Sequence, residues 1–359
     1  MIFLKIRMMR KNTYVIAEIG QNHNGSVETA KSIIELVALQ NIPLRRFLDE
    51  PELVGFNAVK TTIRDLDYEM APSEISKPYE SVNSFGSTYA SHRKHLELTY
   101  IEHSALYKHA KAFDLDFIVT LCAPKCLDVL NYFKPDKIKV ASRDLSNIPL
   151  LRELAQTKIP IIISTGMADI QDIDLAVNEI TKSHSDLSIL HCNSIYPVEY
   201  NDINLLSIQY IRDHFNNTFE VGFSDHTTGI LAAPLAVALG ATIIEKHVTL
   251  SRHMKGSDQL GSLSDEGMYR MLRDIRQAEN SIGHYQKDEK CISKAAKVKL
   301  ERSLCAKDDL LKGRILTEDD FGVISPGSGC QYKDMHLLIG KKLKLDISKN
   351  ELIFLDHVE

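Results

Sequence analysis

EVGFSDH (residues 220–226) and TIIEKH (residues 242–247) decide the fold of this chain. Each stretch begins as a short apolar run and ends in residues able to do chemistry, and the segment between them is long enough for a helix. Buried strands that alternate with helical segments are typical of parallel βαβ units. Segments of this kind recur before residue 250, and eight follow one another: Tyr14–Ile19, Asn57–Lys60, Asp116–Thr120, Lys137–Ser142, Pro160–Ser164, Ser188–Cys192, Glu220–Ser224 and Thr242–His247.

Eight consecutive strand–helix units predict an α/β protein with a closed (β/α)8 or TIM barrel. In such barrels the active site lies at the carboxyl ends of the strands, where the loops to the following helices begin. Residues able to do chemistry collect at these ends: Glu18, Lys60, Thr120, Lys139, Ser142, Ser164, Ser194, Ser224, His226, Glu245 and His247. The pattern therefore indicates an enzyme.

Composition narrows the class of protein further. The chain has 359 residues, 44% of them hydrophobic, so it can bury one large core and has room for a second small domain. The net charge of −5 is spread without long runs of one sign, which argues against nucleic-acid or membrane-surface partners. No apolar run approaches the roughly 20 residues that span a bilayer. The six scattered cysteines favour free thiols in a reducing cytosol. We expect a cytoplasmic protein with small-molecule partners.

Changes in composition suggest the domain boundaries. Leu263–Ile282 carries apolar residues at helical spacing and is predicted to be the last barrel helix. The catalytic barrel is therefore predicted to span residues 1–283, followed by a Lys-rich linker over residues 284–300. Residues 301–359 contain short apolar runs between tight-turn sequences, which predicts a compact, β-rich second domain.

Two connections within the barrel are longer than the usual 2–6 residues. The stretch 41–56, with two prolines and a glycine, is interpreted as an insertion. The stretch 72–93 is interpreted as a long loop at the top of the second strand. A long loop on that face is a natural lid or substrate-binding segment.

Two histidines end neighbouring strands. Because adjacent strands of a barrel lie about 4.8 Å apart, the imidazoles of His226 and His247 can both reach one divalent ion. Solvent or substrate oxygens would complete the shell and leave open positions for Lewis-acid catalysis. A purely structural role for the two histidines is the alternative.

Lysines and hydroxyl groups share the same rim. Lys60 and Lys139, with the serines and threonines around them, have the chemistry of a phosphate or carboxylate site. Either lysine is also a candidate for Schiff-base formation, and each hydroxyl alone is more often a strand-end hydrogen-bonding group. Glu18 is interpreted as a general base or a stabiliser of a cationic intermediate, the alternative being a salt bridge to a rim lysine.

Several motifs carry a family resemblance. AEIGQNHNG (17–25), PIIISTGM (160–167), HCNSIYP (191–197), GFSDHT (222–227) and EKH (245–247) together resemble the sialic acid synthase family, which includes N-acetylneuraminate, legionaminate and pseudaminate synthases. RSL (302–304) and PGSG (326–329) resemble its C-terminal antifreeze-like (SAF, β-clip) domain. The resemblance runs from about residue 13 to residue 355.

The resemblance implies a metal-dependent condensation of phosphoenolpyruvate with an open-chain aldose, giving a 3-deoxy-2-ulosonic acid and phosphate. His226 and His247 would hold Mn²⁺, with Mg²⁺ or Co²⁺ possible instead, and Glu18 would activate water or stabilise the cation at C2. Substrate contacts are implied for Lys60, Thr120, Lys139, Ser142, Ser164, Ser194, Tyr196, Ser224, Glu245 and Asp258. In this family the antifreeze-like domain closes over the partner subunit's barrel, so a domain-swapped homodimer is implied.

The chain departs from the family pattern in its presumed sugar-binding parts. Synthases of N-acetylneuraminate commonly have Lys-x-Gln-Thr after the second strand, where this chain has Thr62 in place of the Gln. They also have Arg just before the Pro-Gly-x-Gly of the antifreeze-like domain, where this chain has Ser325. Lys255-Gly-Ser-Asp258 differs from the common Gly-Pro-Asp. We expect an acceptor that differs from N-acetylmannosamine at C2 or is seated differently.

Two rival interpretations stay open on the sequence. The first is a barrel aldolase or lyase that forms a Schiff base on Lys60 or Lys139. The second is a sugar-binding or ice-binding protein that keeps the fold without catalysis. Retention of both histidines and of Glu18 speaks against the second.

Overall fold

The computed structural model describes residues 12–41, 55–283, 285–288 and 291–359. The chain divides into two compact units, Met1–Gly283 and His284–Glu359, which are described separately here. Most of the stretch 41–56, interpreted above as an insertion, lies outside the described residues. No helix of the described part is long and apolar enough to cross a membrane.

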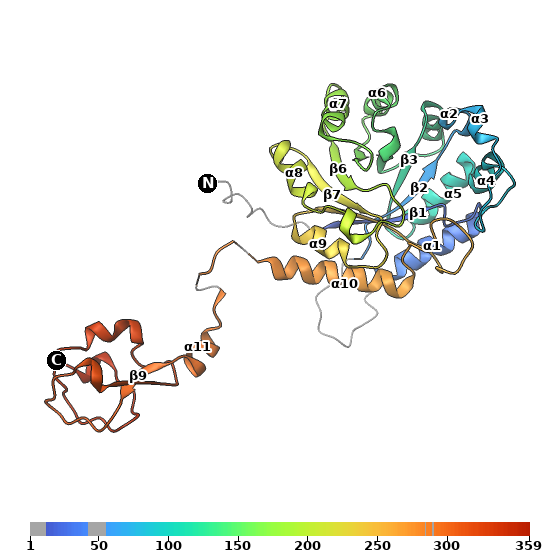
Figure 1. Ribbon diagram of the computed structural model, residues 1–359. Coiled ribbons are helices and arrows are strands. Elements are labelled where there is room, and N and C mark those ends of the chain that lie inside the picture. Colours follow the sequence, from blue (N-terminus) through green and yellow to red (C-terminus); the bar gives the residue numbers. More distant parts are fainter. Residues whose placement is uncertain (1–11, 42–54, 284, 289–290) are drawn as a thin grey trace. The chain divides into compact units, whose positions relative to one another are not determined.

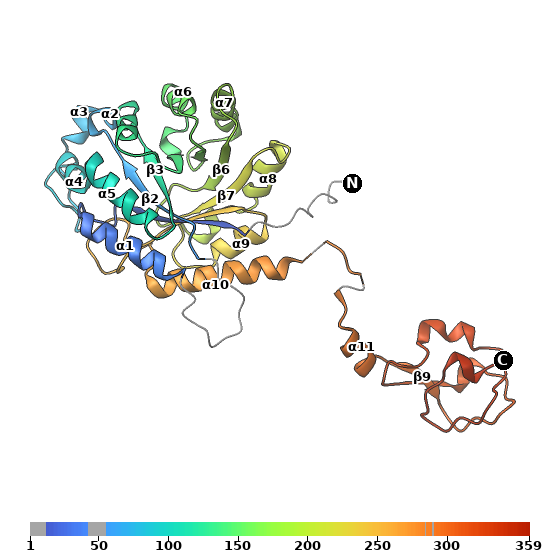
Figure 2. The same cartoon turned by 180° about the vertical axis from the view of Figure 1, so that it is seen from behind.

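The first unit is a closed barrel of eight parallel strands, in which each strand pairs with its neighbours in sequence order and β8 pairs with β1 (Figures 1 and 2). The strands are β1 Tyr14–Gly20, β2 Ala58–Ile63, β3 Asp116–Leu121, β4 Lys137–Val140, β5 Ile161–Ser164, β6 Leu187–Cys192, β7 Glu220–Asp225 and β8 Ile243–His247. The predicted (β/α)8 barrel is confirmed. Two strand ends were wrong by more than one residue. β2 runs to Ile63 and not to Lys60, and β4 ends at Val140, so that Ser142 instead begins a short 3-10 turn, Ser142–Asp144.

Amphipathic helices surround the barrel (Figure 1). They are α1 Val27–Leu39, α5 Tyr100–Lys111, α6 Ile148–Gln156, α7 Ile170–Thr181, α8 Ser207–His214, α9 Ala232–Ala238 and α10 Asp265–Ile282, while a 3-10 helix, Pro124–Asn131, follows β3. Their starts are set locally, as at α5, where Thr99 and Glu102 form a capping box. The apolar stripe of each helix then packs on the outer face of the strands.

The alternation of side chains along the strands builds the floor of the barrel mouth. Successive residues of a strand point to opposite faces, so every second residue enters the barrel. A layer of buried apolar residues fills the interior: Ile16, Ala58, Ile118, Ile162, Leu190 and Ile243. Two residues further along the same strands stand Glu18, Lys60, Thr120, Ser164, Cys192 and Glu245. The apolar layer thus closes the barrel below, and the next layer presents chemistry to the mouth.

The segment 72–93 is less loop-like than the sequence suggested. It contains α3, Pro72–Ile75, and the start of α4, Tyr89–Leu96, and the four-residue helix α2, Leu66–Glu69, precedes it. Between α3 and α4 the chain reaches the loop after β8, because the Lys255 ammonium lies 4.7 Å from the centre of the Phe85 ring. The Gly256 amide also donates to Asn83 Oδ1, at 3.3 Å. The segment therefore tethers the loop that carries Asp258.

The second unit has its own small core. Helix α11, Lys294–Leu300, lies within the predicted linker, and strands β9, Ser303–Ala306, and β10, Phe321–Ile324, form an antiparallel pair. The rest of the described unit consists of isolated bridges and 3-10 turns. Its core consists of Leu304, Ala306, Leu310, Leu316, Met335, Leu338, Leu343, Ile347, Ile353 and Val358.

Candidate active site

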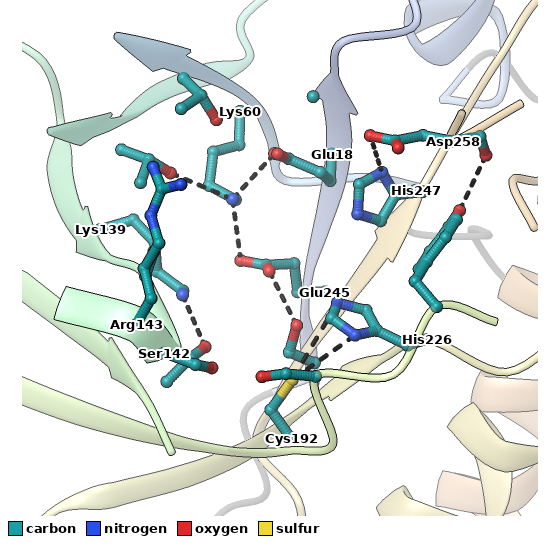
Figure 3. Close-up of a pocket in the computed structure, with 18 of the residues that line it drawn as sticks. Glu18, Lys60, Lys139, Ser142, Arg143, Cys192, His226, Glu245, His247 and Asp258 are labelled. Carbon is teal, nitrogen blue, oxygen red and sulfur yellow. Dashed lines mark hydrogen bonds and ion pairs between the residues drawn. The ribbon is translucent and has the colours of Figure 1, made fainter. Parts of the chain in front are cut away.

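A cavity of about 340 Å³ opens at the carboxyl ends of the barrel strands. It is lined by every residue singled out above for catalysis, substrate or metal: Glu18, Lys60, Thr120, Lys139, Ser142, Ser164, Ser194, Tyr196, Ser224, His226, Glu245, His247 and Asp258. Figure 3 shows the lysines on one side of this cavity and the histidines on the other. The structure therefore brings the whole predicted set together.

The centre of the cavity is a buried group of charges. Lys60 Nζ lies 2.9 Å from Glu18 Oε2 and 3.6 Å from Glu245 Oε2, and it donates to Thr120 Oγ1 at 3.2 Å. Ser224 Oγ donates to the other oxygen of Glu245 at 2.9 Å. One lysine thus balances parts of two carboxylates, and the salt bridge weighed above for Glu18 is present.

The two carboxylates differ in proton affinity. Burial, with the charge of Glu245 nearby, raises the pKa of Glu18 to about 7 even though Lys60 opposes this shift. Burial also acts against the charged form of Glu245, but Lys60 and Lys139 outweigh it and lower the pKa of Glu245 to about 2. Near neutral pH, Glu245 is a fixed negative charge, whereas Glu18 can both take up and release a proton.

Lys139 is a buried cation of a different kind. Its ammonium donates to Ser164 Oγ at 2.5 Å and to the Val140 carbonyl at 3.0 Å. It makes no ion pair with any carboxylate of the described residues, and only 2% of the residue is exposed. Burial lowers its pKa. A buried ammonium that donates to a hydroxyl group and has no ion-pair partner among the described residues is suited to bind an anion, although Glu245 is close enough for Lys139 to lower its pKa.

The two histidines face each other across the far side of the cavity, with ring centres 5.8 Å apart. His226 Nδ1 lies 2.7 Å from the Asn193 carbonyl, so this nitrogen donates and Nε2 keeps its lone pair. His247 Nδ1 is buried and has no hydrogen-bond partner among the described residues, with Asp258 Oδ2 4.0 Å away. His247 thus has a nitrogen without a hydrogen-bond partner among the described residues, whereas His226 Nε2 lies 4.0 Å from the Cys192 thiol.

Backbone geometry and Tyr196 hold this side of the site. Gly20 has φ +53°, and a Cβ at that position would lie 3.1 Å from the His247 ring, so a side chain there would crowd the imidazole. The Tyr196 ring packs against both imidazoles, with centres 5.3 and 4.9 Å away. Its hydroxyl donates to the Asp258 carbonyl at 2.9 Å. Tyr196 therefore orders both histidines and the loop of Asp258.

Protonation of the histidines follows from their surroundings. Burial lowers the pKa of His247 to about 4, so the ring is neutral near pH 7. Burial opposes protonation of His226 too, but its contact with the Cys192 thiol, 3.8 Å from Nδ1, raises its pKa overall. No cluster of three or more His, Cys, Asp or Glu side chains suited to a metal exists in the described part of the chain. A metal here would take two protein ligands and leave the rest to solvent and substrate.

Comparison with known proteins assigns the chain to a family. Residues 48–287 match the NeuB family, and residues 301–359 match the SAF domain. The chain is 31% identical to an N,N'-diacetyllegionaminic acid synthase of Legionella pneumophila over 99% of this chain and 97% of that one. The chain belongs to the NeuB family.

Other NeuB relatives agree with this membership. An N-acetylneuraminate-9-phosphate synthase of Homo sapiens is 29% identical over 96% of this chain and 92% of that protein. The crystal structure of an N-acetylneuraminic acid synthetase from Leptospira borgpetersenii, in complex with citrate, is 27% identical, covers 80% of this chain and 90% of that one, and gives a TM-score of 0.66. The resemblance to sialic acid synthases and the prediction of an enzyme are confirmed.

Several cavity residues of this NeuB chain escaped the sequence analysis, among them one on a strand and two in turns. Cys192 follows Leu190 by two positions on β6, so strand alternation was sufficient to find it. Arg64 lies just past the end of β2, and Arg143 lies in the 3-10 turn after β4. No periodicity extends into such turns, and neither arginine carries a sequence signal that separates it from a surface residue.

Proposed function

We propose that the chain condenses phosphoenolpyruvate with an open-chain aldose to give a 3-deoxy-2-ulosonic acid and phosphate. The observation that carries the proposal is Lys139, a buried cation without a carboxylate partner among the described residues, with Ser142 and Ser164 beside it. The names of the relatives support the same reaction class, since they are synthases of legionaminic, neuraminic and pseudaminic acids.

Each charged group of the cavity has a separate role in the proposed reaction. Lys139 and its hydroxyl neighbours bind the phosphate of phosphoenolpyruvate, and Lys60 with Thr120 receives its carboxylate. Glu18, whose pKa lies near 7, takes a proton from the water that adds at C2. Glu245 keeps its charge, holds Lys60 and accepts a hydrogen bond from a sugar hydroxyl.

A divalent metal, Mn²⁺ foremost, fits the two histidines. His226 donates from Nδ1 to a carbonyl and thereby keeps Nε2 for a ligand, as metal-binding histidines do. His247 has a buried nitrogen without a partner among the described residues and is neutral near pH 7. When bound, the ion would supply Lewis-acid polarisation of the aldehyde oxygen. Tyr196 and Asp258 would orient the aldose beside it.

The acceptor is proposed to differ from N-acetylmannosamine at C2 or to be seated differently. Thr62 lines the cavity where an amide side chain would otherwise stand. Ser325 donates to the Leu300 carbonyl within the second unit, and its short side chain lacks the bidentate fork of Arg. N-acetylmannosamine turned over faster than every other aldose would contradict this point. The homodimer and the cytoplasmic location stay predictions.

The decisive experiment measures phosphate release from phosphoenolpyruvate by the purified protein with Mn²⁺, across free and phosphorylated aldoses. We expect release with one or a few aldoses, its loss in EDTA, and its return when Mn²⁺ is restored. Loss of release in the Lys139→Met variant ties the activity to this cavity. Absence of release with every aldose would count against the condensation.

Lys139 itself favours one competing function. A buried lysine with a lowered pKa is what a Schiff-base aldolase requires. Treatment with borohydride in the presence of phosphoenolpyruvate and the accepted aldose separates the two. A covalent adduct at Lys139, found by mass spectrometry of tryptic peptides, would support the aldolase, whereas the condensation proposed here forms none.

A further inference from the structure

Two arginines meet at the cavity wall on the lysine side. Arg64 follows β2 directly, Arg143 lies in the turn after β4, and both line the cavity. Arg64 Nη1 and Arg143 Nη2 each lie 3.0 Å from the same oxygen of Glu69, on the short helix α2. In Figure 3 the Arg143 side chain stands beside Lys139, across the cavity from His226 and His247.

Carboxylates that do not line the cavity pair with both guanidinium groups. Arg64 Nε lies 3.8 Å from Glu97, and Arg143 Nε lies 3.5 Å from Asp144. Neither these two carboxylates nor Glu69 is among the described residues that line the cavity. A guanidinium has five N–H donors, and the carboxylates engage only some of them. Arg143 also has a hydrogen bond with the Cys122 side chain. Because both arginines line the cavity, their remaining donors are available to a ligand there, and a guanidinium recognises phosphate through two parallel hydrogen bonds.

The cavity face of the cluster is positive. A third arginine, Arg93, is almost wholly buried and shares Glu97 with Arg64, at 3.4 Å. The three arginines are matched by three carboxylates, Glu69, Glu97 and Asp144, but none of these carboxylates lines the cavity, whereas Arg64 and Arg143 do. The groups of the cluster that an entering anion would meet are therefore positive.

Phosphoenolpyruvate does not account for these donors. It has one phosphate and one carboxylate, for which the proposed reaction already uses Lys139 with its serines and Lys60 with Thr120. Arg64 and Arg143 are additional to both. We propose that Arg64 and Arg143 form a second phosphate subsite in the cavity, which takes the phosphate group of a phosphorylated aldose or the inorganic phosphate released in turnover. The choice between these sources rests on the proposed function, and so does the separation of this subsite from the one that takes the phosphate of phosphoenolpyruvate.

Binding is tested first, with inorganic phosphate as the probe and no phosphoenolpyruvate present. Isothermal titration calorimetry of the full chain is expected to show two phosphate sites. Lys139→Met removes one, and Arg143→Met or Arg64→Met weakens the other by about 10- to 100-fold, the range for a lost charge-assisted contact. Arg143→Lys keeps the positive charge but loses the paired guanidinium donors, so it should weaken the second phosphate site less than Arg143→Met does.

A matched control comes from the barrel surface. Arg152 on α6 pairs with Glu179 at 2.8 Å, is exposed, and lies outside the set of cavity-lining residues, so Arg152→Met is expected to leave both phosphate sites unchanged. Arg143 is the safer variant because about a third of its side chain is exposed (35%), and circular dichroism checks that it folds. A single phosphate site in the unaltered protein, or two intact sites in Arg143→Met, would overturn the proposal.

Turnover then identifies the source of the phosphate group. If it belongs to the aldose, Arg143→Met lowers kcat/KM for the phosphorylated aldose about 10- to 100-fold more than for the same unphosphorylated aldose, mainly through KM. If it is the released phosphate, the variant relieves product inhibition and treats both aldoses alike. No turnover with any aldose, together with two phosphate sites in calorimetry, would refute the condensation and leave the subsite standing.

Discussion

The barrel carries two sets of buried charges that face opposite sides of its wall. Asp225 on β7 and Lys246 on β8 point outward and pair at 2.9 Å with no exposed side-chain surface. Asp225 also accepts from the backbone and hydroxyl of Thr227, and Lys246 donates to the Thr227 carbonyl. The two outward charges are thus paired with each other and hydrogen-bonded within the protein. The inward set stands on β1, β2, β4 and β8 and leaves Lys139 without a carboxylate ion pair among the described residues.

The difference separates charges that hold the barrel from charges that await a ligand. Asp225 and Lys246 immediately precede His226 and His247, and their cross-strand pairing fixes the backbone from which both imidazoles leave. The inward lysines are also buried, but they line the cavity, so an anion that entered it would contact them. Removing an outward charge should therefore damage folding, whereas removing Lys139, the inward cation without an ion pair among the described residues, should damage binding and spare the fold.

Breaking the outward pair should have the largest effect. Lys246→Met leaves Asp225 buried without its partner, so we expect a loss of about 3–5 kcal/mol in the free energy of unfolding. The measurement is the urea midpoint by circular dichroism. Asp225→Asn combined with Lys246→Met removes both charges and should recover part of the loss. A single variant as stable as the parent would contradict the assignment of this pair to folding.

Removing Lys139 should affect activity strongly and stability little, the reverse of what is expected for Lys246. Lys139→Met deletes a buried charge and leaves Glu245 with Lys60 as its cation, so the urea midpoint should change much less than in Lys246→Met. Phosphate release should fall by about 100- to 1,000-fold, the usual loss for one charge-stabilising group in a closed site. Steady-state assays with saturating aldose give the rate. Unchanged release with unchanged stability would remove Lys139 from the proposed anion site.

The structure also explains which residues of the site could be predicted from the sequence and which could not. The ends of the apolar strand segments located Glu18, Lys60 and Glu245, because the carboxyl ends of barrel strands meet at the active-site face. That signal stops where the strand stops. Arg143 was missed for that reason, since its place depends on the 3-10 turn that starts at Ser142. The sequence motifs identified the family. Local sequence patterns, however, do not reveal which residues pair in the folded protein, as Glu69 does with Arg143.

A half-exposed pair in the second unit should give an intermediate effect. Asp320 accepts two bonds from Arg314, at 2.9 and 2.6 Å, and two from Thr317. Burial opposes its charged form, but these donors outweigh it and lower its pKa. The contribution of Asp320 to stability is therefore present above the unfolded-state pKa of about 4 and is lost as the pH falls through the lower folded-state value.

Asp320→Asn should cost the second unit about 1–2 kcal/mol at pH 7 and should remove that acid dependence. Amide hydrogen exchange on the full chain, read at β9 and β10, measures the effect without separating the units. Exchange in the barrel strands serves as the internal control and should not change. An acid dependence at β9 and β10 that persists in the variant would mean that another carboxylate carries it.

The smallest effect on stability should come from a solvent-exposed ion pair. Lys77 and Glu74 lie 2.7 Å apart, but their side chains are 62% and 52% exposed. Solvent screens the attraction, and ordering two long side chains offsets much of what remains, so Lys77→Ala should change stability by less than about 0.5 kcal/mol. The urea midpoint of this variant, set beside that of Lys246→Met, isolates burial as the variable, because both pairs have nearly the same separation. A loss for Lys77→Ala as large as that for Lys246→Met would show that distance, and not the exclusion of water, decides what a charge pair contributes in this protein.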